Sequence, residues 1–266
     1  MRKAKGDRNK FYVQSIHRAF VIIDAISKAN NRGLSLSEIA DKIDLPVSTV
    51  YRIVQNLAAW QYLAEKDDGN YVLGLTFLTM GNIVKDNLTL RNYARKYMEE
   101  LNQETKETIY LAILDHKNND IIYIDKVESQ RNIKLAAGVG SHNYIHSTAN
   151  GKALVSRLSN DKIREMLCAK GMPALTDRTI TDMAAFLAEI DRVRQAGFAL
   201  DDFENELGVR CVAAPICDYT GKVVAAMSIS GVEMTMDLAV INGVYADLVK
   251  KYALKISGRM GYNGQS

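Results

Sequence analysis

The stretch Ser35–Gly74 constrains the fold of this chain more than any other. Apolar residues recur at helical spacing over 36–43, and Ser35 followed by Glu38 has the pattern of a capping box at the start of that helix. Pro46 then disfavours helix in the residue before it and suits the first turn of a new one. A second helix is therefore predicted over 47–57, after a tight turn.

The outward face of this second helix suits contacts with base edges and phosphates. Two short alternating runs, 62–66 and 71–73, flank turn residues 67–70 and predict a β-hairpin, the wing of a winged helix-turn-helix. Double-stranded DNA is the first partner to consider, and a winged helix that binds another protein is the alternative. The predicted DNA contacts are Ser35, Val47, Ser48, Thr49, Tyr51, Arg52, Gln55 and Lys66.

The charge distribution agrees with a DNA-binding N-terminal part. Residues 1–90 carry 12 Lys or Arg against 9 Asp or Glu, whereas residues 91–266 carry 22 of each. The whole excess of +3 therefore lies beside the predicted helix-turn-helix. No apolar run reaches the roughly 18 residues of a membrane span, and no signal peptide is recognisable, so a cytoplasmic protein is expected.

Periodicity divides the chain into a basic arm at 1–12, a winged helix-turn-helix at 13–74, a linker helix at 75–89 and a second domain at 90–264. The first domain also holds a helix over 15–29, and the joint between two linker helices is expected at 82–87. The second domain is predicted to be α+β with a largely antiparallel sheet. Its strands are expected at 109–115, 121–127, 133–137, 198–201, 209–218 and 222–230, and its helices at 148–158, 161–169, 182–196 and 236–261.

An enzyme is the rival class, and its signals are weak. Cys211 with Asp201 could form a nucleophilic site, but the apolar neighbours of Cys211 predict burial, which opposes thiolate formation. His142 and His146 have metal-ligand spacing for a helix, yet they fall in a segment expected to be extended, with no third ligand evident. We therefore expect no catalytic residue, metal or cofactor.

Three motifs in the right order resemble the IclR family of bacterial transcription regulators. They are LPVSTVYR at 45–52, STANGKA at 147–153, and GFALD at 197–201 leading to GVRCVAAPI at 208–216, closed by AMSISG at 226–231. Segments 107–111, 122–128 and 255–262 resemble the branch that controls sugar-acid catabolism, typified by the 2-keto-3-deoxygluconate regulator. The resemblance covers nearly the whole chain.

This resemblance implies a winged helix-turn-helix joined by linker helices to a GAF-like effector-binding domain, in dimers or tetramers on a palindromic operator. It implies a small carboxylate effector, and repression more than activation, with RNA polymerase as a further partner of an activator. Carried over motif by motif, the effector pocket comprises Ala149, Asn150, Asp201, Cys211, Ser228 and Ser230. Backbone amides at a helix start and serine hydroxyls are neutral donors for a carboxylate, which Asp201 would complement by accepting from sugar hydroxyls.

Two residues depart from the family pattern. Many members have lysine at the position of Val47, so one expected phosphate or base contact is missing. The position of Asn150 is often small or apolar in the family, and here the amide either reaches into the pocket and favours a hydroxylated ligand or is a surface group.

Overall fold

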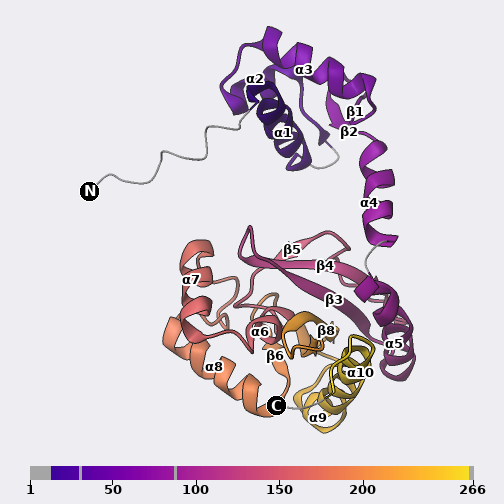
Figure 1. The fold of residues 1–266 in the computed structure, drawn as a ribbon, viewed down its shortest axis with the longest axis vertical. Helices are drawn as coiled ribbons and strands as arrows, with labels where there is room; N and C mark the ends of the chain where they lie inside the picture. Colours follow the sequence, from indigo (N-terminus) through magenta and orange to yellow (C-terminus); the bar gives the residue numbers. More distant parts are fainter. Residues whose placement is uncertain (1–12, 30–31, 87–88, 264–266) are drawn as a thin grey trace. The chain divides into compact units, whose positions relative to one another are not determined.

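The computed structural model describes residues 13–29, 32–86 and 89–263, with side chains described outside 84–89, and divides the chain into two compact units, Met1–Asn87 and Leu88–Ser266. The predicted basic arm at 1–12 lies outside the described residues. None of the helices in the described part combines the length and the apolar character needed to cross a membrane. Figure 1 shows the elements of both units.

The first unit is a three-helix core with a small wing. It contains α1 (Gln14–Ser27), α2 (Leu36–Ile43), α3 (Val47–Ala59), β1 (Leu63–Glu65), β2 (Tyr71–Leu73) and α4 (Thr76–Asp86). The predicted capping box forms at α2: the Glu38 backbone N–H donates to Ser35 Oγ over 3.3 Å, and the Ser35 N–H donates to Glu38 Oε2 over 2.9 Å. β1 and β2 pair antiparallel through the predicted turn, so the winged helix-turn-helix prediction is confirmed.

Helix α4 occupies most of the segment 75–89 that the sequence predicts as the linker. α4 continues through Asp86, into the segment 82–87 where the joint is expected, and α5 begins at Thr89. Residues 87 and 88, between these two helices in the sequence, lie outside the described part.

The second unit is built on a six-stranded antiparallel sheet in the order β5-β4-β3-β8-β7-β6. The strands are β3 (Thr108–Asp115), β4 (Asp120–Val127), β5 (His142–Asn143), β6 (Ala199–Asp202), β7 (Val209–Cys217) and β8 (Val223–Val232). Helices α6 (Ala149–Val155), α7 (Asn160–Lys170) and α8 (Met183–Ala196) cover one face, while α5 (Thr89–Thr105) and α10 (Ala246–Arg259) cover the other (Figure 1). The α+β class is thus as predicted.

The two faces bury two separate cores because side chains alternate along each strand. Ile109 and Leu111 of β3 pack with α5 and α10, whereas Tyr110 and Ala112 pack with α6, α7 and α8. The start of α6 packs tightly on the turn that precedes it, because Gly151 faces the backbone of Ile145, where a Cβ atom would come within 2.3 Å of the carbonyl oxygen. α6 itself packs on β7 and β8, two of the strands that carry the candidate pocket.

The predicted strand over 133–137 is wrong. The segment is irregular, and the sheet edge is occupied instead by the two-residue strand β5. Two carbonyl groups of segment 133–137 accept hydrogen bonds from side chains and not from a neighbouring strand: Tyr110 Oη donates to Ala137 O over 3.0 Å, and Lys126 Nζ donates to Leu135 O over 2.7 Å. The segment therefore crosses over the sheet face that carries Tyr110.

The predicted continuous helix over 236–261 is also wrong. Asp237 caps a three-residue helix, α9 (Leu238–Val240), which passes through the π-helical turn η3 (Ile241–Tyr245) into α10. Gly243 lies within that wide turn, where its weak α-helical preference lowers the cost of departing from regular α-helix.

Candidate functional site

The exposed face of α3 carries the predicted reading residues. Tyr51 is 50% exposed and Val47 is 47% exposed, while the side chains of Ser48 and Arg52 also face solvent. Val50 and Val54 are fully buried on the opposite side of the same helix. The helix therefore presents a polar face while its apolar stripe holds it in the core.

Three predicted contacts have partners within the protein. Gln55 Nε2 donates to Tyr71 Oη over 3.2 Å, which ties α3 to the wing. The exposed Lys66 Nζ lies 3.3 Å from an oxygen of Asp68 in the wing turn. The hydroxyl of Ser35 is engaged in the capping box, so this side chain has a structural role independent of DNA.

A groove of about 510 Å³ lies between α1 and α3. Its lining includes Arg18 and Gln14 of α1 and Arg52, Thr49 and Asn56 of α3. Two guanidinium groups with neutral hydrogen-bonding side chains suit a phosphate. The sequence reasoning missed Arg18 and Gln14, although Arg18 is the one lysine or arginine within α1.

In the second unit, the sheet register aligns four polar side chains in one row. Thr108 of β3 pairs with Ser230 of β8, Ser230 pairs with Cys211 of β7, and Cys211 pairs with Asp201 of β6. Directly paired residues share a face of the sheet. Three of the predicted effector residues therefore lie side by side, and Thr108 extends their row by one strand.

Asn150 joins α6 to this row. Its side chain is 3% exposed, which rules out a surface amide, and its Nδ2 donates to Ser228 Oγ over 2.8 Å. Ser228 and Ser230 point to the same face, as their alternation predicts, with 3.1 Å between their hydroxyl oxygens. Among the described residues, Asn150 Oδ1 has no hydrogen-bond partner although it is buried. The amide therefore keeps a free acceptor at the pocket.

Asp201 is almost completely buried and holds the loop that follows β6. One of its oxygens accepts from the backbone N–H groups of Glu204, over 2.8 Å, and Asn205, over 3.3 Å. Burial, reinforced by the nearby charge of Glu204, raises the pKa of Asp201 to about 7. Below that pH the carboxyl is neutral and does not repel an anionic ligand.

A buried ion pair between Lys152 and Glu204 also holds the loop that follows β6. Lys152 of α6 is fully buried, and its Nζ donates to Leu200 O over 2.7 Å and to Glu204 Oε1 over 2.5 Å. Burial raises the pKa of Glu204, and the charge of Lys152 opposes that rise. This pair fixes the loop that closes one side of the pocket.

Cys211 is unsuited to nucleophilic catalysis. Burial raises the pKa of its thiol well above the usual range, and the charge of Asp201 adds to the effect. A thiol held in its protonated form is a weak nucleophile, so Cys211 contributes a small apolar surface to the pocket.

These residues surround a cavity of about 50 Å³. Ala149, Asn150, Asp201, Cys211 and Ser230 line it, while Ser228 lies behind Asn150 and Ser230. Two buried tyrosines that sequence reasoning missed complete the wall, with 4.6 Å between the ring centroids of Tyr110 and Tyr123. The signal that could have found them is one tyrosine in each of two consecutive predicted strands, 109–115 and 121–127, which the structure pairs.

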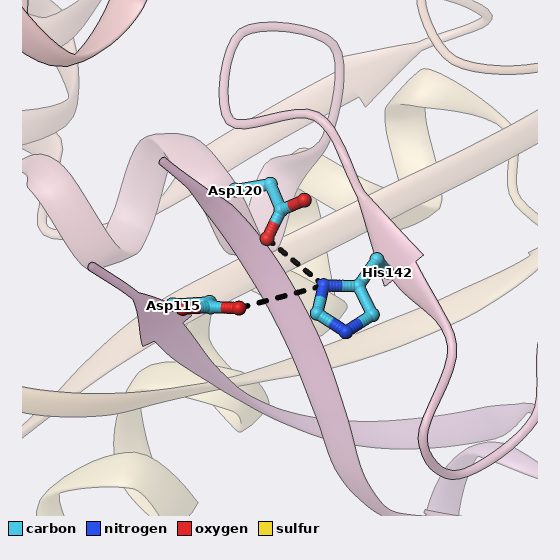
Figure 2. Close-up of side chains that lie close together, drawn as sticks. All are labelled: Asp115, Asp120 and His142. Carbon is cyan, nitrogen blue, oxygen red and sulfur yellow. Dashed lines mark hydrogen bonds and ion pairs between the residues drawn. The ribbon is translucent and has the colours of Figure 1, made fainter. Parts of the chain in front are cut away.

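The two histidines with metal-ligand spacing do not meet. His146 is fully buried, and its Nε2 lies 3.0 Å from Pro173 O, away from His142. Figure 2 shows His142 beside Asp120 and Asp115, with 2.9 Å and 3.8 Å from Nδ1 to their respective carboxylates. Each of these three residues offers an atom that could bind a metal ion.

The carboxylates of this group already have partners in the protein. Asp120 Oδ2 lies 2.7 Å from Lys170 Nζ, and Asp115 accepts from the Lys117 backbone N–H and the Asn118 side chain. The network ties the β3–β4 turn to β5 and α7. Its geometry is accounted for by these hydrogen bonds and ion pairs.

Comparison with known proteins assigns both units to one protein family. Residues 15–67 match the family profile described as the IclR helix-turn-helix domain, and residues 83–258 match the one described as the C-terminal part of the bacterial transcriptional regulator IclR. The chain belongs to the IclR family. It is a DNA-binding transcriptional regulator with an effector-binding C-terminal domain, and not an enzyme.

Individual relatives extend over nearly the whole chain. The HTH-type transcriptional regulator KdgR of Escherichia coli (strain K12) is 33% identical over 264 residues, which cover 99% of this chain and 98% of KdgR. The HTH-type transcriptional repressor AllR of the same strain is 29% identical, over 93% of this chain and 90% of AllR. The crystal structure of Thermotoga maritima IclR has a TM-score of 0.75 at 32% identity, covering 94% of this chain and 100% of that one.

Proposed function

We propose that this IclR-family protein represses a catabolic operon in the cytoplasm and is controlled by a small carboxylate, a sugar acid or keto acid. The observation that carries the proposal is the hydrogen-bonded chain Asn150–Ser228–Ser230, which lines and backs a cavity in the effector domain. Buried neutral polar groups around a small cavity are suited to bind a small polar ligand.

The pocket offers donors for a carboxylate and acceptors for hydroxyl groups. The backbone amides of Ala149 and Asn150, in the first turn of α6, have no partner within the helix and supply donors. Ser230 adds a hydroxyl that lines the cavity, with Ser228 hydrogen-bonded behind it, while Asn150 Oδ1 supplies an acceptor for a ligand hydroxyl. Asp201 accepts from a hydroxyl when ionised and donates to the ligand when protonated.

On the DNA side, α3 enters the major groove and the wing lies along the phosphates. Ser48, Thr49, Tyr51, Arg52 and Gln55 contact bases or phosphates, with Lys66 in the wing and Ser35 at the start of α2. Val47 lies exposed on the same face and offers no charged contact to a phosphate.

A palindromic operator requires two copies of the chain. Apolar side chains on α1 support a homo-oligomer, because Ile16 is 54% exposed and Phe20 is 65% exposed. Exposed aromatic and aliphatic groups on one helix are typical of surfaces covered by a second subunit.

The DNA contact is tested by selecting bound duplexes from a random library and measuring affinity for the selected sequence. Arg52→Ala should weaken binding by about tenfold to a hundredfold, which is the usual cost of losing a base-specific arginine contact. Lys28→Ala is the matched control, since Lys28 is an exposed cation at the end of α1, paired with Asp24. Equal affinities of the wild type and Arg52→Ala would refute the assignment of α3.

Effector control is tested by calorimetry with a panel of hexonates, keto-deoxy acids and short keto acids. A Ser228→Ala, Ser230→Ala double variant should lose ligand binding while its affinity for the selected duplex stays unchanged. If the wild type binds no acid of the panel, the carboxylate proposal fails.

Repression is tested by transcription in vitro from a promoter that carries the selected duplex. The protein alone should lower the transcript level, and the acid that binds should restore it. A transcript level that rises with the protein would instead indicate an activator that contacts RNA polymerase.

A further inference from the structure

A second cavity adjoins the effector pocket. It lies over the ends of β3 and β8. Its volume is about 430 Å³, whereas that of the effector pocket is about 50 Å³. Both cavities are lined by Ser230 of the polar row and by Leu135 of the irregular segment. Ser230 thus separates a small compartment from a larger one on the same face of the sheet.

Thr108 places an unpaired hydroxyl at the larger cavity. The residue lies opposite Ser230 in the register, its side chain is completely buried, and it lines the cavity. Among the residues that the structure describes, no hydrogen-bond partner reaches its Oγ1. Because a buried hydroxyl without a partner costs free energy, its presence here points to a group that the cavity receives.

The charges at this cavity cancel each other. Glu107 is 2% exposed, and its Oε1 accepts from Arg131 Nε over 2.6 Å. The absence of a side chain at Gly231 makes this arrangement possible, since a Cβ there would lie 2.5 Å from Glu107 Oε2. The remaining polar lining is neutral and includes Gln130 and Asn132. Paired charges and neutral amides favour uncharged hydroxyl groups over a second anion.

Size separates the two compartments further. A volume of 50 Å³ holds roughly four water-sized groups, close to an acid of two or three carbons. A six-carbon acid therefore has to extend past Ser230 into the larger cavity. We propose that the cavity over Thr108 is a second ligand subsite, which receives the neutral, hydroxylated tail of an acid whose carboxylate end lies beside Asn150. This inference rests on the proposed effector pocket.

Thr108→Val tests the subsite because it removes the hydroxyl and keeps the shape of the side chain. Calorimetry on the full chain compares pyruvate, which fits the small cavity, with gluconate, which needs both. The variant should bind gluconate about three- to tenfold more weakly, the cost of one neutral hydrogen bond, and pyruvate as tightly as the wild type does. Thr220→Val, on the exposed turn between β7 and β8, is the matched control and should change neither affinity.

The folding of the variant is checked by its melting temperature, which should rise because an unpaired buried hydroxyl is removed. Should Thr108→Val fail to fold, Asn132→Ala replaces it, since this exposed side chain lines the same cavity. Equal effects on pyruvate and gluconate, no effect on either, or a wild type that binds pyruvate alone would overturn the subsite and leave the effector pocket standing. Failure of the wild type to bind any acid would instead refute the pocket itself.

Discussion

Replacing Asp201 by asparagine should stabilise the effector domain, and increasingly so as the pH rises. The carboxyl is 2% exposed and its pKa is raised from an ordinary value of 3.8 to about 7. This difference of about three pKa units corresponds to about 4 kcal/mol. Asparagine keeps the oxygen that accepts from the Glu204 and Asn205 backbone N–H groups, so the loop retains its anchor.

The direction follows from proton linkage. An acid whose pKa is higher in the folded protein is protonated in both states only well below the ordinary pKa of 3.8, and there it costs nothing. As the pH rises from 4 to 7, the unfolded chain ionises first, and the folded state loses stability relative to it. The stabilisation by Asp201→Asn should therefore grow by about 2 to 3 kcal/mol between pH 5 and pH 8.

The assay is urea unfolding followed by circular dichroism at several pH values, for the wild type and the variant. His146 is present in both proteins, so its own pH dependence cancels in the difference, whereas the interaction between Asp201 and Glu204 is part of the effect that the difference measures. A difference in unfolding free energy that is the same at pH 5 and pH 8 would refute the raised pKa and the burial argument behind it.

Three further predictions concern neighbouring features. Lys152→Met should destabilise the protein by about 3 to 5 kcal/mol, because it leaves Glu204 buried without its cation, and adding Glu204→Gln should recover most of the loss in urea unfolding. Gly151→Ala should cost about 2 kcal/mol or more in melting experiments, because the new Cβ meets the Ile145 backbone; a silent substitution would contradict the close approach of α6. Val47→Lys should tighten binding to the selected duplex and steepen its salt dependence by about one counterion, and an unchanged slope would place this position away from the phosphates.

Local structure in the first unit was predictable from sequence because its determinants lie within a few residues of each other. The Ser35 capping box, the break at Pro46 and the wing turn each involve neighbours in the chain, and each forms where the pattern predicts. The same holds for the alternation that brings Ser228 and Ser230 to one face.

The prediction was wrong in two segments whose local sequence pattern is compatible with more than one backbone conformation. The apolar alternation over 133–137 suits a strand, but the Tyr110 hydroxyl and the Lys126 ammonium satisfy its carbonyls in place of a neighbouring strand. The C-terminal helix has helical periodicity throughout, yet it passes through a wide turn at Gly243. Contacts with other elements decide the backbone conformation in the first case, whereas in the second a glycine lowers the cost of the wide turn.

The sequence by itself determined the two functional halves of this protein, a DNA-reading helix with its wing and an α+β domain with the family's pocket motifs. Only the tertiary structure aligned Thr108, Ser230, Cys211 and Asp201 in one row, set Asn150 against Ser228, and placed a second cavity beside the first. The physical reason is strand register. Pairing between residues far apart in the chain depends on how whole faces of the sheet bury their side chains, which no short segment encodes.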